Sequence, residues 1–492
     1  MRSSWLRDAG VAACAALALA AAFPKFGAAW LVPFGTAALF LTWQGASWRR
    51  AAILGWFSGT IFFTIAFSWI GHTVGSYIGV FAPVLPVAVG LMEAPFFALA
   101  AVLAALAYRH VRPAFAPLAA ASVFTACDWI RSIGILGAPF AQLGYTQAET
   151  PLRAIAAYGG TYGVTFVLCC LGAYFADAIL RRSWKPLASV ALATIAATML
   201  AWWFWPARHL PAPHIPVAAV QGNIAQSLKW NSLDLAVVRY TSMTRTTYGH
   251  KPKLVVWPET VITTVLNRDP FLLKQFRTLS TTMKSTLVVG TQTWRERKMY
   301  NSLYVFAPNG GYAVYDKRQL VPFAESFPGR EFLSWVPYVG ELSSRFSSGP
   351  VDGVYKTQAL RIAPLICWES PFADLAFSQI RDGAQLLVIS TDDAWFGTTS
   401  GPYMHAQIAQ LRAIESGAYV VRAAATGVSG IINPDGSWQS RSRMEETIVE
   451  YGKVAPRVDT VFSHIGPTAI GIAAWMLYAL LMLVPTTTRR RL

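Results

Sequence analysis

The residues LRIAPLICWESP, at positions 360–371, place an apolar strand directly before a bend and a helix start. Leu360–Ile366 is predicted as the strand, and Ser370-Pro371 is typical of a helix N-cap followed by proline at the first helical position. Cys367 lies between them, where the positive end of a helix dipole stabilises a thiolate. This geometry presents a nucleophile, whereas a lone cysteine judged by composition alone is more often a small core hydrophobe.

The sequence on both sides of this stretch alternates β-rich runs with amphipathic helical patterns, which predicts an α/β layered domain over residues 209–463. The predicted strands are Ile215–Gln221, Lys253–Val256, Thr286–Gly290, Ser302–Phe306, Tyr312–Tyr315, Leu360–Ile366, Gln385–Ser390, Val420–Ala424, Gly430–Ile432 and Ile448–Val454. The predicted helices are Leu233–Tyr248, Pro270–Met283 (with Asp269 as N-cap), Phe372–Arg381 and Met404–Ser416. Asn309-Gly310 and Asp435-Gly436 supply hairpin turns.

The rest of the chain is strongly apolar. Of 492 residues, 54% are hydrophobic and 13% are charged, whereas soluble proteins carry about 25% charged residues. This excludes a disordered chain and argues against an ordinary cytosolic enzyme. A membrane span needs roughly 20 apolar residues, and the candidates are Ala9–Phe23, Phe26–Trp43, Ala51–Trp69, Leu85–Ala107, Phe115–Trp129, Tyr162–Leu180, Leu187–Trp205 and Ile465–Val484. We expect a polytopic α-helical membrane protein of about eight spans, with about seven in residues 1–208 and one in residues 464–492.

The basic residues indicate how these spans are oriented. With eight spans, all the basic clusters fall on one side: Arg2 and Arg7, Arg49-Arg50, Arg109 to Arg112, Arg181-Arg182 with Lys185, and Arg489 to Arg491. The positive-inside rule then places both termini in the cytoplasm and the α/β domain outside it. The net charge of +16 is largely topological, so no nucleic-acid partner is expected. We also expect the first helix to remain uncleaved, because a second apolar span follows it at once.

A cysteine nucleophile needs a base and a group that stabilises the oxyanion. The domain's histidines (His209, His214, His250 and His405) lie in no obvious catalytic context, and His405 is expected to be a structural or lid residue. Glu259 follows a strand in Trp-Pro-Glu-Thr, and its apolar flanks are expected to raise its pKa towards that of a useful base. Lys317 ends a hairpin strand and precedes Glu325. Alone, each also fits an exposed loop or strand-end residue.

Together, Trp-Pro-Glu, Asp-Lys with Pro-Phe-Ala-Glu, and Cys-Trp-Glu resemble the Glu-Lys-Cys signature of the nitrilase superfamily, in the same order and at similar spacing. Asp393-Ala394-Trp395-Phe396-Gly397 is similar to an element of its membrane branch, the apolipoprotein N-acyltransferases. Gln221-Gly222-Asn223-Ile224, with Gln226 and Lys229-Trp230, matches the same branch. The resemblance covers the whole chain and implies an αββα sandwich for the α/β domain.

The resemblance also implies roles for individual residues. Glu259 is expected to be the general base, Lys317 the cation facing the oxyanion and Cys367 the nucleophile. The supporting or substrate-binding residues are expected to be Glu325, Trp368, Glu369, Trp230 and Trp395, with Trp230 on a mobile region near the acyl chain. Two positions depart from the family pattern: Ala324 replaces a glycine, which we expect to tighten the Glu325 loop, and Asp392 replaces an asparagine.

The family's activity is transfer of a fatty acyl chain from a membrane phospholipid, through a cysteine thioester, to the N-terminal amine of a diacylglyceryl-cysteine apolipoprotein. The resemblance therefore implies three partners: a phospholipid, a diacylated apolipoprotein and the bilayer. It places the chain in the bacterial inner membrane with a periplasmic catalytic domain. The sequence carries no metal or nucleotide motif, so no cofactor is expected. A membrane-tethered amidase or nitrilase-type hydrolase with the same triad is the alternative, and a catalytically silent lipid-binding protein is disfavoured by the triad itself.

Overall fold

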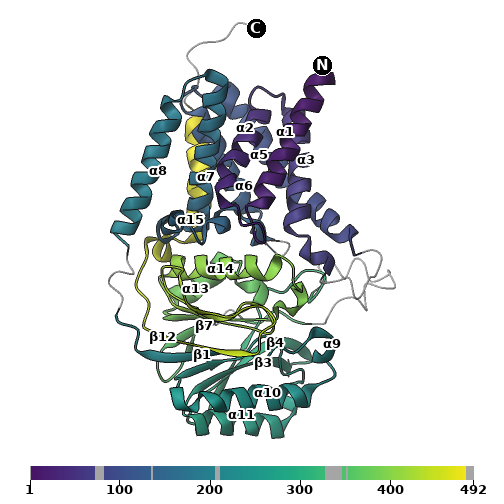
Figure 1. The fold of residues 1–492 in the computed structure, drawn as a ribbon, viewed down its shortest axis with the longest axis vertical. Coiled ribbons are helices and arrows are strands. Elements are labelled where there is room, and N and C mark those ends of the chain that lie inside the picture. Colours follow the sequence, from purple (N-terminus) through teal and green to yellow (C-terminus); the bar gives the residue numbers. More distant parts are fainter. Residues whose placement is uncertain are drawn as a thin grey trace.

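The computed structural model describes residues 2–72, 82–134, 137–205, 211–326, 346–350 and 353–483. These residues form two parts, a helical bundle and an α/β domain below it (Figure 1). The predicted basic tail at Arg489 to Arg491 and the boundary at residues 208–209 lie outside the described residues. α1 begins, and α15 ends, at the face of the bundle that is remote from the α/β domain (Figure 1).

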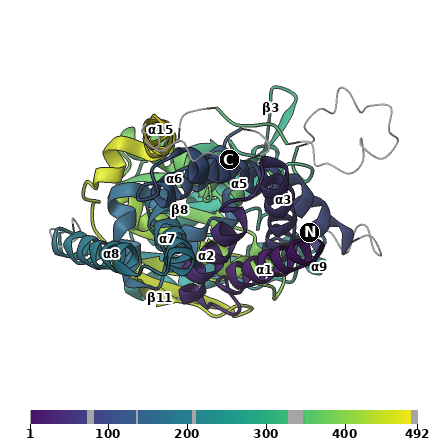
Figure 2. The same cartoon turned by 90° about the horizontal axis from the view of Figure 1, so that it is seen from above.

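Eight helices occupy the positions of the eight predicted spans. They are α1 (Arg2–Ala21), α2 (Val32–Trp43), α3 (Trp48–Ala66), α5 (Val84–His110), α6 (Ala116–Ile130), α7 (Ala156–Arg181), α8 (Lys185–Trp203) and α15 (Val461–Met482). Among the described residues, four segments are long and apolar enough to cross a membrane: Val84–His110, Pro151–Arg181, Lys185–Trp203 and Val461–Met482. The helices therefore support membrane association. Seen from above, α8 lies at the periphery of the bundle (Figure 2).

Two six-stranded sheets form the centre of the α/β domain. The first has the order β12-β1-β2-β3-β4-β5 and the second β11-β10-β9-β8-β7-β6. The strands of the two sheets are β1 (Ile215–Gln221), β2 (Leu254–Val256), β3 (Thr286–Arg295), β4 (Lys298–Phe306), β5 (Tyr312–Asp316), β6 (Tyr355–Lys356), β7 (Arg361–Ile366), β8 (Leu386–Thr391), β9 (Val420–Ala424), β10 (Gly430–Ile432), β11 (Trp438–Arg441) and β12 (Ile448–Val454). β1, β2 and β3 run parallel, as do β7, β8 and β9.

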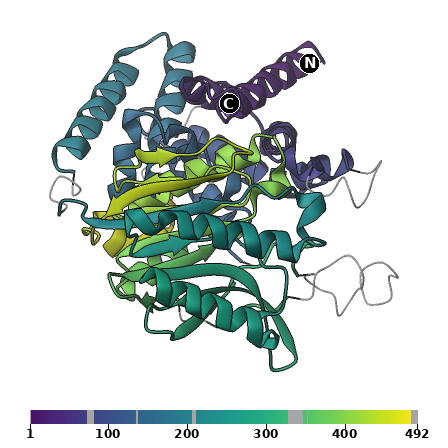
Figure 3. The same ribbon diagram turned by 60° about the horizontal axis from the view of Figure 1, so that its bottom comes forward.

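Apolar side chains from both sheets meet in one buried layer between them, which includes Val256, Val288, Ile366 and Val388. α10 (Leu233–Thr246) and α11 (Pro270–Met283) cover the outer face of the first sheet (Figure 3). α13 (Ala373–Arg381) and α14 (Gly401–Ser416) cover the outer face of the second sheet, facing the bundle (Figure 1). The domain is thus an α/β sandwich with the layer order helix, sheet, sheet, helix.

Every predicted strand is present, but two were predicted too short and two were missed. β3 and β4 extend to a tight hairpin whose turn residues, Glu296 and Arg297, both have positive φ. Neither is the glycine or asparagine that usually marks such a turn, so no residue type indicated this turn. β6 and β11 are short edge strands without a strong alternating pattern. The Asp269 side chain accepts a hydrogen bond from the backbone N–H of Leu272, which confirms the predicted N-cap.

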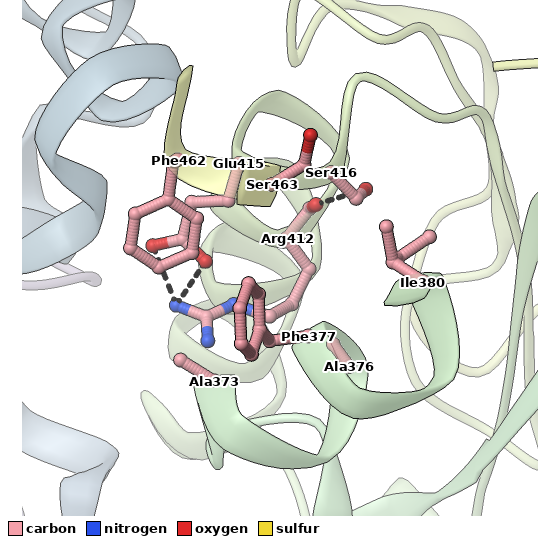
Figure 4. A pocket seen from close by; sticks show the side chains of 9 residues that line it. All are labelled: Ala373, Ala376, Phe377, Ile380, Arg412, Glu415, Ser416, Phe462 and Ser463. Carbon is pink, nitrogen blue, oxygen red and sulfur yellow. Dashed lines mark hydrogen bonds and ion pairs between the residues drawn. The ribbon is translucent and has the colours of Figure 1, made fainter. Parts of the chain in front are cut away.

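A buried polar cluster joins the α/β domain to the bundle. Glu415 on α14 accepts hydrogen bonds from the backbone N–H and the hydroxyl of Thr161 on α7, at 2.7 and 2.8 Å. Arg412 pairs with Glu415 at 2.9 Å, beside the start of α15 (Figure 4). α7 kinks at Gly160, where φ is 61° and an added Cβ would lie 2.2 Å from the Phe462 ring. Backbone and ring therefore meet at a position that only glycine suits.

Candidate active site

Three strand ends bring the predicted triad together inside the sandwich. Glu259 follows β2, Lys317 comes directly after β5, and Cys367 comes directly after β7. Lys317 Nζ lies 3.0 Å from Glu259 Oε1, and Cys367 is close enough to both side chains for their charges to shift its pKa. All three side chains are buried. The structure therefore brings three residues that are far apart in sequence, at positions 259, 317 and 367, into one site.

Lys317 lies between two carboxylates. Its ammonium group donates to Glu259 Oε1 and to Glu325 Oε1, each at 3.0 Å. Burial alone would lower the pKa of Lys317, but Glu259 and Glu325 outweigh it and raise the pKa above its ordinary value. Lys317 is thus a permanent cation, suited to stabilising negative charge and unsuited to accepting a proton. Glu325 also accepts the backbone N–H of Val321 at 2.9 Å, which fixes its position.

The expectation that apolar flanks raise the pKa of Glu259 is wrong. Burial does act in that direction, but the ammonium groups of Lys317 and Lys229, together with hydrogen bonds from Lys317 and Asn301, lower the pKa below its ordinary value. Glu259 is therefore an anion at neutral pH and is ready to accept a proton.

Asn301 is a site residue that the sequence analysis missed. It lies on β4, and its side-chain amide donates to Glu259 Oε1 at 2.8 Å and to Glu325 Oε1 at 2.9 Å. It therefore sets the distance between the two carboxylates that flank Lys317. The sequence offered no signal for this role, because Asn301 lies just before the predicted strand Ser302–Phe306 and β4 also contains the polar residues Lys298 and Ser302.

Cys367 has an unusual backbone conformation. Its φ is 48°, in the left-handed region that costs a residue with a Cβ roughly 1–2 kcal/mol. The turn is fixed by the Ser370 hydroxyl, which donates to the Cys367 carbonyl at 3.1 Å, and by His405 Nε2, 3.1 Å from the same oxygen. His405 also lies 2.9 Å from Asp393. The structure gives His405 a positioning role at the nucleophile's turn.

The predicted helix start at Ser370-Pro371 is wrong. A single 3-10 turn, η9 (Cys367–Glu369), follows the cysteine, and α13 begins only at Ala373. Ser370 is used to close the turn and does not cap α13. Burial, with the nearby Glu259 carboxylate, raises the pKa of the Cys367 thiol well above its ordinary value, against the opposing effect of Lys317. The resting group is a thiol, so a base has to remove its proton during attack.

Glu369 lies behind the triad and supports it. Its carboxylate accepts the backbone N–H groups of Ile366 (2.7 Å) and Arg318 (2.6 Å) and the hydroxyl of Tyr315 (2.9 Å). It therefore ties the turn that carries Cys367 to the strand end that carries Lys317. These contacts define a structural role for this carboxylate within the site.

The predicted aromatic residues lie in two different environments. The Trp368 ring stacks on Phe140 from the bundle, with ring centroids 5.7 Å apart and an interplanar angle of 10°. Trp395 lies in the short helix Asp393–Phe396 and is partly buried. Trp230 is about half exposed, and the ammonium of Lys229 lies 5.7 Å from its ring centroid. Trp368 thus joins the nucleophile's turn to the bundle, and Trp230 remains accessible.

Comparisons with known proteins cover both parts of the chain. A carbon-nitrogen hydrolase family profile matches residues 216–456, and the profile of the apolipoprotein N-acyltransferase N-terminal domain matches residues 15–174. An apolipoprotein N-acyltransferase of Azotobacter vinelandii is 33% identical over 443 residues, 85% of this chain and 84% of the relative. One from Pseudomonas syringae is 30% identical over 473 residues, 91% of each chain. The chain belongs to the apolipoprotein N-acyltransferase family.

The chain is also similar to solved structures over part of its length. A carbon-nitrogen hydrolase superfamily protein from Xanthomonas campestris covers 56% of this chain and 98% of its own, with 19% identity and a TM-score of 0.40. Membership of the apolipoprotein N-acyltransferase family rests on the sequence matches, which extend through the bundle. An acyltransferase is therefore favoured over the hydrolase alternative, because the relatives share both parts.

Ala324 and Asp392, the two positions at which the sequence analysis expected a departure from the family pattern, lie close to the site. In the turn that carries Glu325, the left-handed conformation belongs to Phe323 (φ 64°), and Ala324 follows it. Asp392 is buried, pairs with Lys229, and donates its backbone N–H to Glu259 Oε2 at 3.0 Å. Asp392 thus places an acidic residue beside Glu259.

Proposed function

We propose that Cys367, Glu259 and Lys317 carry out acyl transfer in this chain as nucleophile, general base and oxyanion-stabilising cation. The observation that supports these roles most directly is the position of Lys317 Nζ, 3.0 Å from both Glu259 and Glu325, beside a buried thiol. The cation holds the base in its ionised form and also offers hydrogen bonds to an oxyanion. Glu325 and Asn301 position the Lys317–Glu259 ion pair.

In the first half-reaction the thiol attacks the carbonyl carbon of a phospholipid ester. Glu259 takes the thiol proton as the sulfur–carbon bond forms, and the carbonyl oxygen becomes an oxyanion stabilised by Lys317. The intermediate collapses when the ester carbon–oxygen bond breaks. The leaving alkoxide takes from Glu259 the proton that came from the thiol, and a lysophospholipid departs. The acyl group remains on Cys367 as a thioester.

In the second half-reaction the N-terminal amine of a diacylglyceryl-cysteine apolipoprotein attacks the thioester. Glu259 accepts the amine proton, the carbon–sulfur bond breaks, and the proton returns to the sulfur. The products are an N-acylated protein and the original thiol. Water has to be kept from the thioester, and the burial of all three catalytic side chains serves this purpose.

The membrane part brings the site to its lipid substrates. A soluble enzyme would have to extract acyl chains at about 0.8 kcal/mol per methylene. We infer about eight spans, about seven in residues 1–208 and one in residues 464–492, with residues 209–463 as the catalytic domain. By the positive-inside rule, both termini are cytoplasmic and the catalytic domain is periplasmic, in a bacterial inner membrane.

Product analysis separates this activity from hydrolysis. Purified full-length protein is incubated with phospholipid and a diacylated lipopeptide, and the products are identified by mass spectrometry. Transfer predicts an N-acylated lipopeptide and a lysophospholipid in equal amounts. Release of free fatty acid with the lipopeptide unchanged would support the tethered hydrolase.

A further inference from the structure

A second buried ion pair lies directly beside the proposed base. The ammonium of Lys229 pairs with the carboxylate of Asp392, and the two side chains are 7% and 1% exposed. Lys229 lies at the end of α9 (Gln226–Lys229), which follows β1 of the first sheet. Asp392 follows β8 of the second sheet. The pair therefore joins the two halves of the sandwich at the depth of Glu259.

Both members of the pair also contact Glu259. The backbone N–H of Asp392 donates to Glu259 Oε2 at 3.0 Å, and Lys229 Nζ lies 3.5 Å from the backbone carbonyl oxygen of Glu259. Asn301 and Lys317 hold the other carboxylate oxygen, Oε1. The geometry of the base is thus set on one side by Asn301 and Lys317, and on the other by Lys229 and Asp392.

The surroundings make the balance of charge in this pair matter. Asp392 Oδ1 is buried and has no hydrogen-bond partner among the described residues, so Lys229 provides its charge compensation. The cationic groups that act on Glu259 are Lys317 and Lys229, and both favour its ionised form. The nearby negative groups are Asp392 and Glu325, and Glu325 pairs with Lys317. Removing either member of the pair would leave the other charge buried and uncompensated beside the base.

We propose that Lys229 and Asp392 are positioning residues, whose ion pair holds Glu259 in place and sets the pH range in which it accepts the proton of Cys367. This inference rests on the proposed role of Glu259. It assigns a role to Asp392, whose side chain pairs with Lys229 and whose backbone N–H donates to Glu259. The Lys229 ammonium also lies 5.7 Å from the centroid of the Trp230 ring.

The test is the pH dependence of acyl-adduct formation on Cys367. Full-length wild type, Asp392→Asn, Lys229→Met and the double variant are mixed with phosphatidylethanolamine in detergent micelles, and initial rates of adduct formation are followed by mass spectrometry. Asp392→Asn leaves Lys229 uncompensated, which favours ionised Glu259. The fall in rate on acidification, the acid limb of the pH profile, should therefore move to lower pH. Lys229→Met leaves Asp392 opposite Glu259 and should move the limb to higher pH.

The expected shift for each single variant is about one pH unit, as for a unit charge a few ångströms from a buried carboxylate. In the double variant, which lacks both charges, the limb should return towards the wild-type position. Glu296→Gln is the matched control: it removes one exposed carboxylate from the β3–β4 turn of the same domain and should leave the limb unchanged.

The possible outcomes distinguish a failure of this inference from a failure of the proposed acyl-transfer function. If wild-type protein forms no adduct at Cys367, the proposed function fails. If wild type forms the adduct but the single variants lose thermal stability and rate without moving the acid limb, the pair is only structural and the inference is overturned. Shifts of the two single variants in opposite directions would support it.

Discussion

Lys317 Nζ lies 3.0 Å from Glu259 Oε1, with both side chains buried, so the proposed base and the proposed oxyanion cation are one ion pair. The pair explains the protonation states of the site. Lys317 keeps Glu259 ionised, and Glu259 keeps Lys317 charged. Neither group can be removed without changing the other.

Replacing Lys317 by Met should slow turnover strongly and destabilise the protein. Glu259 and Glu325 would be left buried without their cation, which costs about 3–5 kcal/mol when one partner of a buried pair is removed. Loss of the oxyanion contact should reduce the rate of adduct formation by roughly 10²–10³-fold. Lys317→Arg, which keeps the charge, should recover most of the stability. Wild-type rates in Lys317→Met would contradict the proposed role.

Replacing Cys367 by Ala should remove activity and leave the fold intact. The substitution deletes one small group, so the melting temperature in detergent should fall by a few degrees at most. Adduct formation and lipopeptide acylation should both be undetectable. Loss of expression or of protease resistance would instead show that Cys367 serves mainly to fill the core.

The pH profile of the wild type tests the ionisation state of Glu259. An unperturbed glutamate has a pKa of about 4.3, and the pKa of Glu259 lies below its ordinary value. Its contribution to stability is therefore present above the unfolded pKa and is lost as pH falls through the folded one. Adduct formation should therefore be lost on acidification only at a pH below the ordinary glutamate pKa. An acid limb near neutral pH would show that Glu259 is not an ionised base.

Asn301→Leu should slow the reaction by roughly 10–100-fold, because one amide no longer holds Glu259 and Glu325. Asn309→Leu, in the exposed β4–β5 hairpin, is the matched control and should leave the rate unchanged. Rates of thioester formation for the two variants provide the comparison. Equal rates for the two variants would show that Asn301 does not contribute to the reaction.

The junction between the bundle and the catalytic domain has a natural pair of test positions. Gly160→Ala places a methyl group 2.2 Å from the Phe462 ring at a positive φ, and overpacking of this kind costs about 1–3 kcal/mol. Gly159→Ala meets no atom within 4 Å and should be neutral or slightly stabilising. Thermal unfolding in detergent should separate the two variants. Equal melting temperatures would show that the kink in α7 can relax.

The elements with strong local signals could be predicted from the sequence. β1, β9, β10, β12 and α11 begin and end where the sequence predicts, because each combines an apolar run with a turn or a cap. The β3–β4 hairpin was not predicted, because its Glu296-Arg297 turn has no characteristic residue type. The triad was predicted from the resemblance of three motifs, in their order and spacing, to the Glu-Lys-Cys signature of the nitrilase superfamily.

The electrostatics of the site could not be predicted in the same way. The sequence places apolar residues beside Glu259, but its pKa is lowered by Lys317, which follows β5, and by Lys229, at the end of α9. Asn301 and the Lys229–Asp392 pair depend on which strands become neighbours. That information is long-range, and no local pattern carries it.

The central claim is that Cys367 carries the acyl group, and intact-protein mass spectrometry after incubation with phospholipid tests it most directly. We predict a mass increase of one fatty acyl chain, located on Cys367, formed much more slowly in Glu259→Gln, and lost when a diacylated lipopeptide is added as that peptide becomes N-acylated. Equal adducts in wild type and Glu259→Gln, or lipopeptide acylation by Cys367→Ala, would contradict the account.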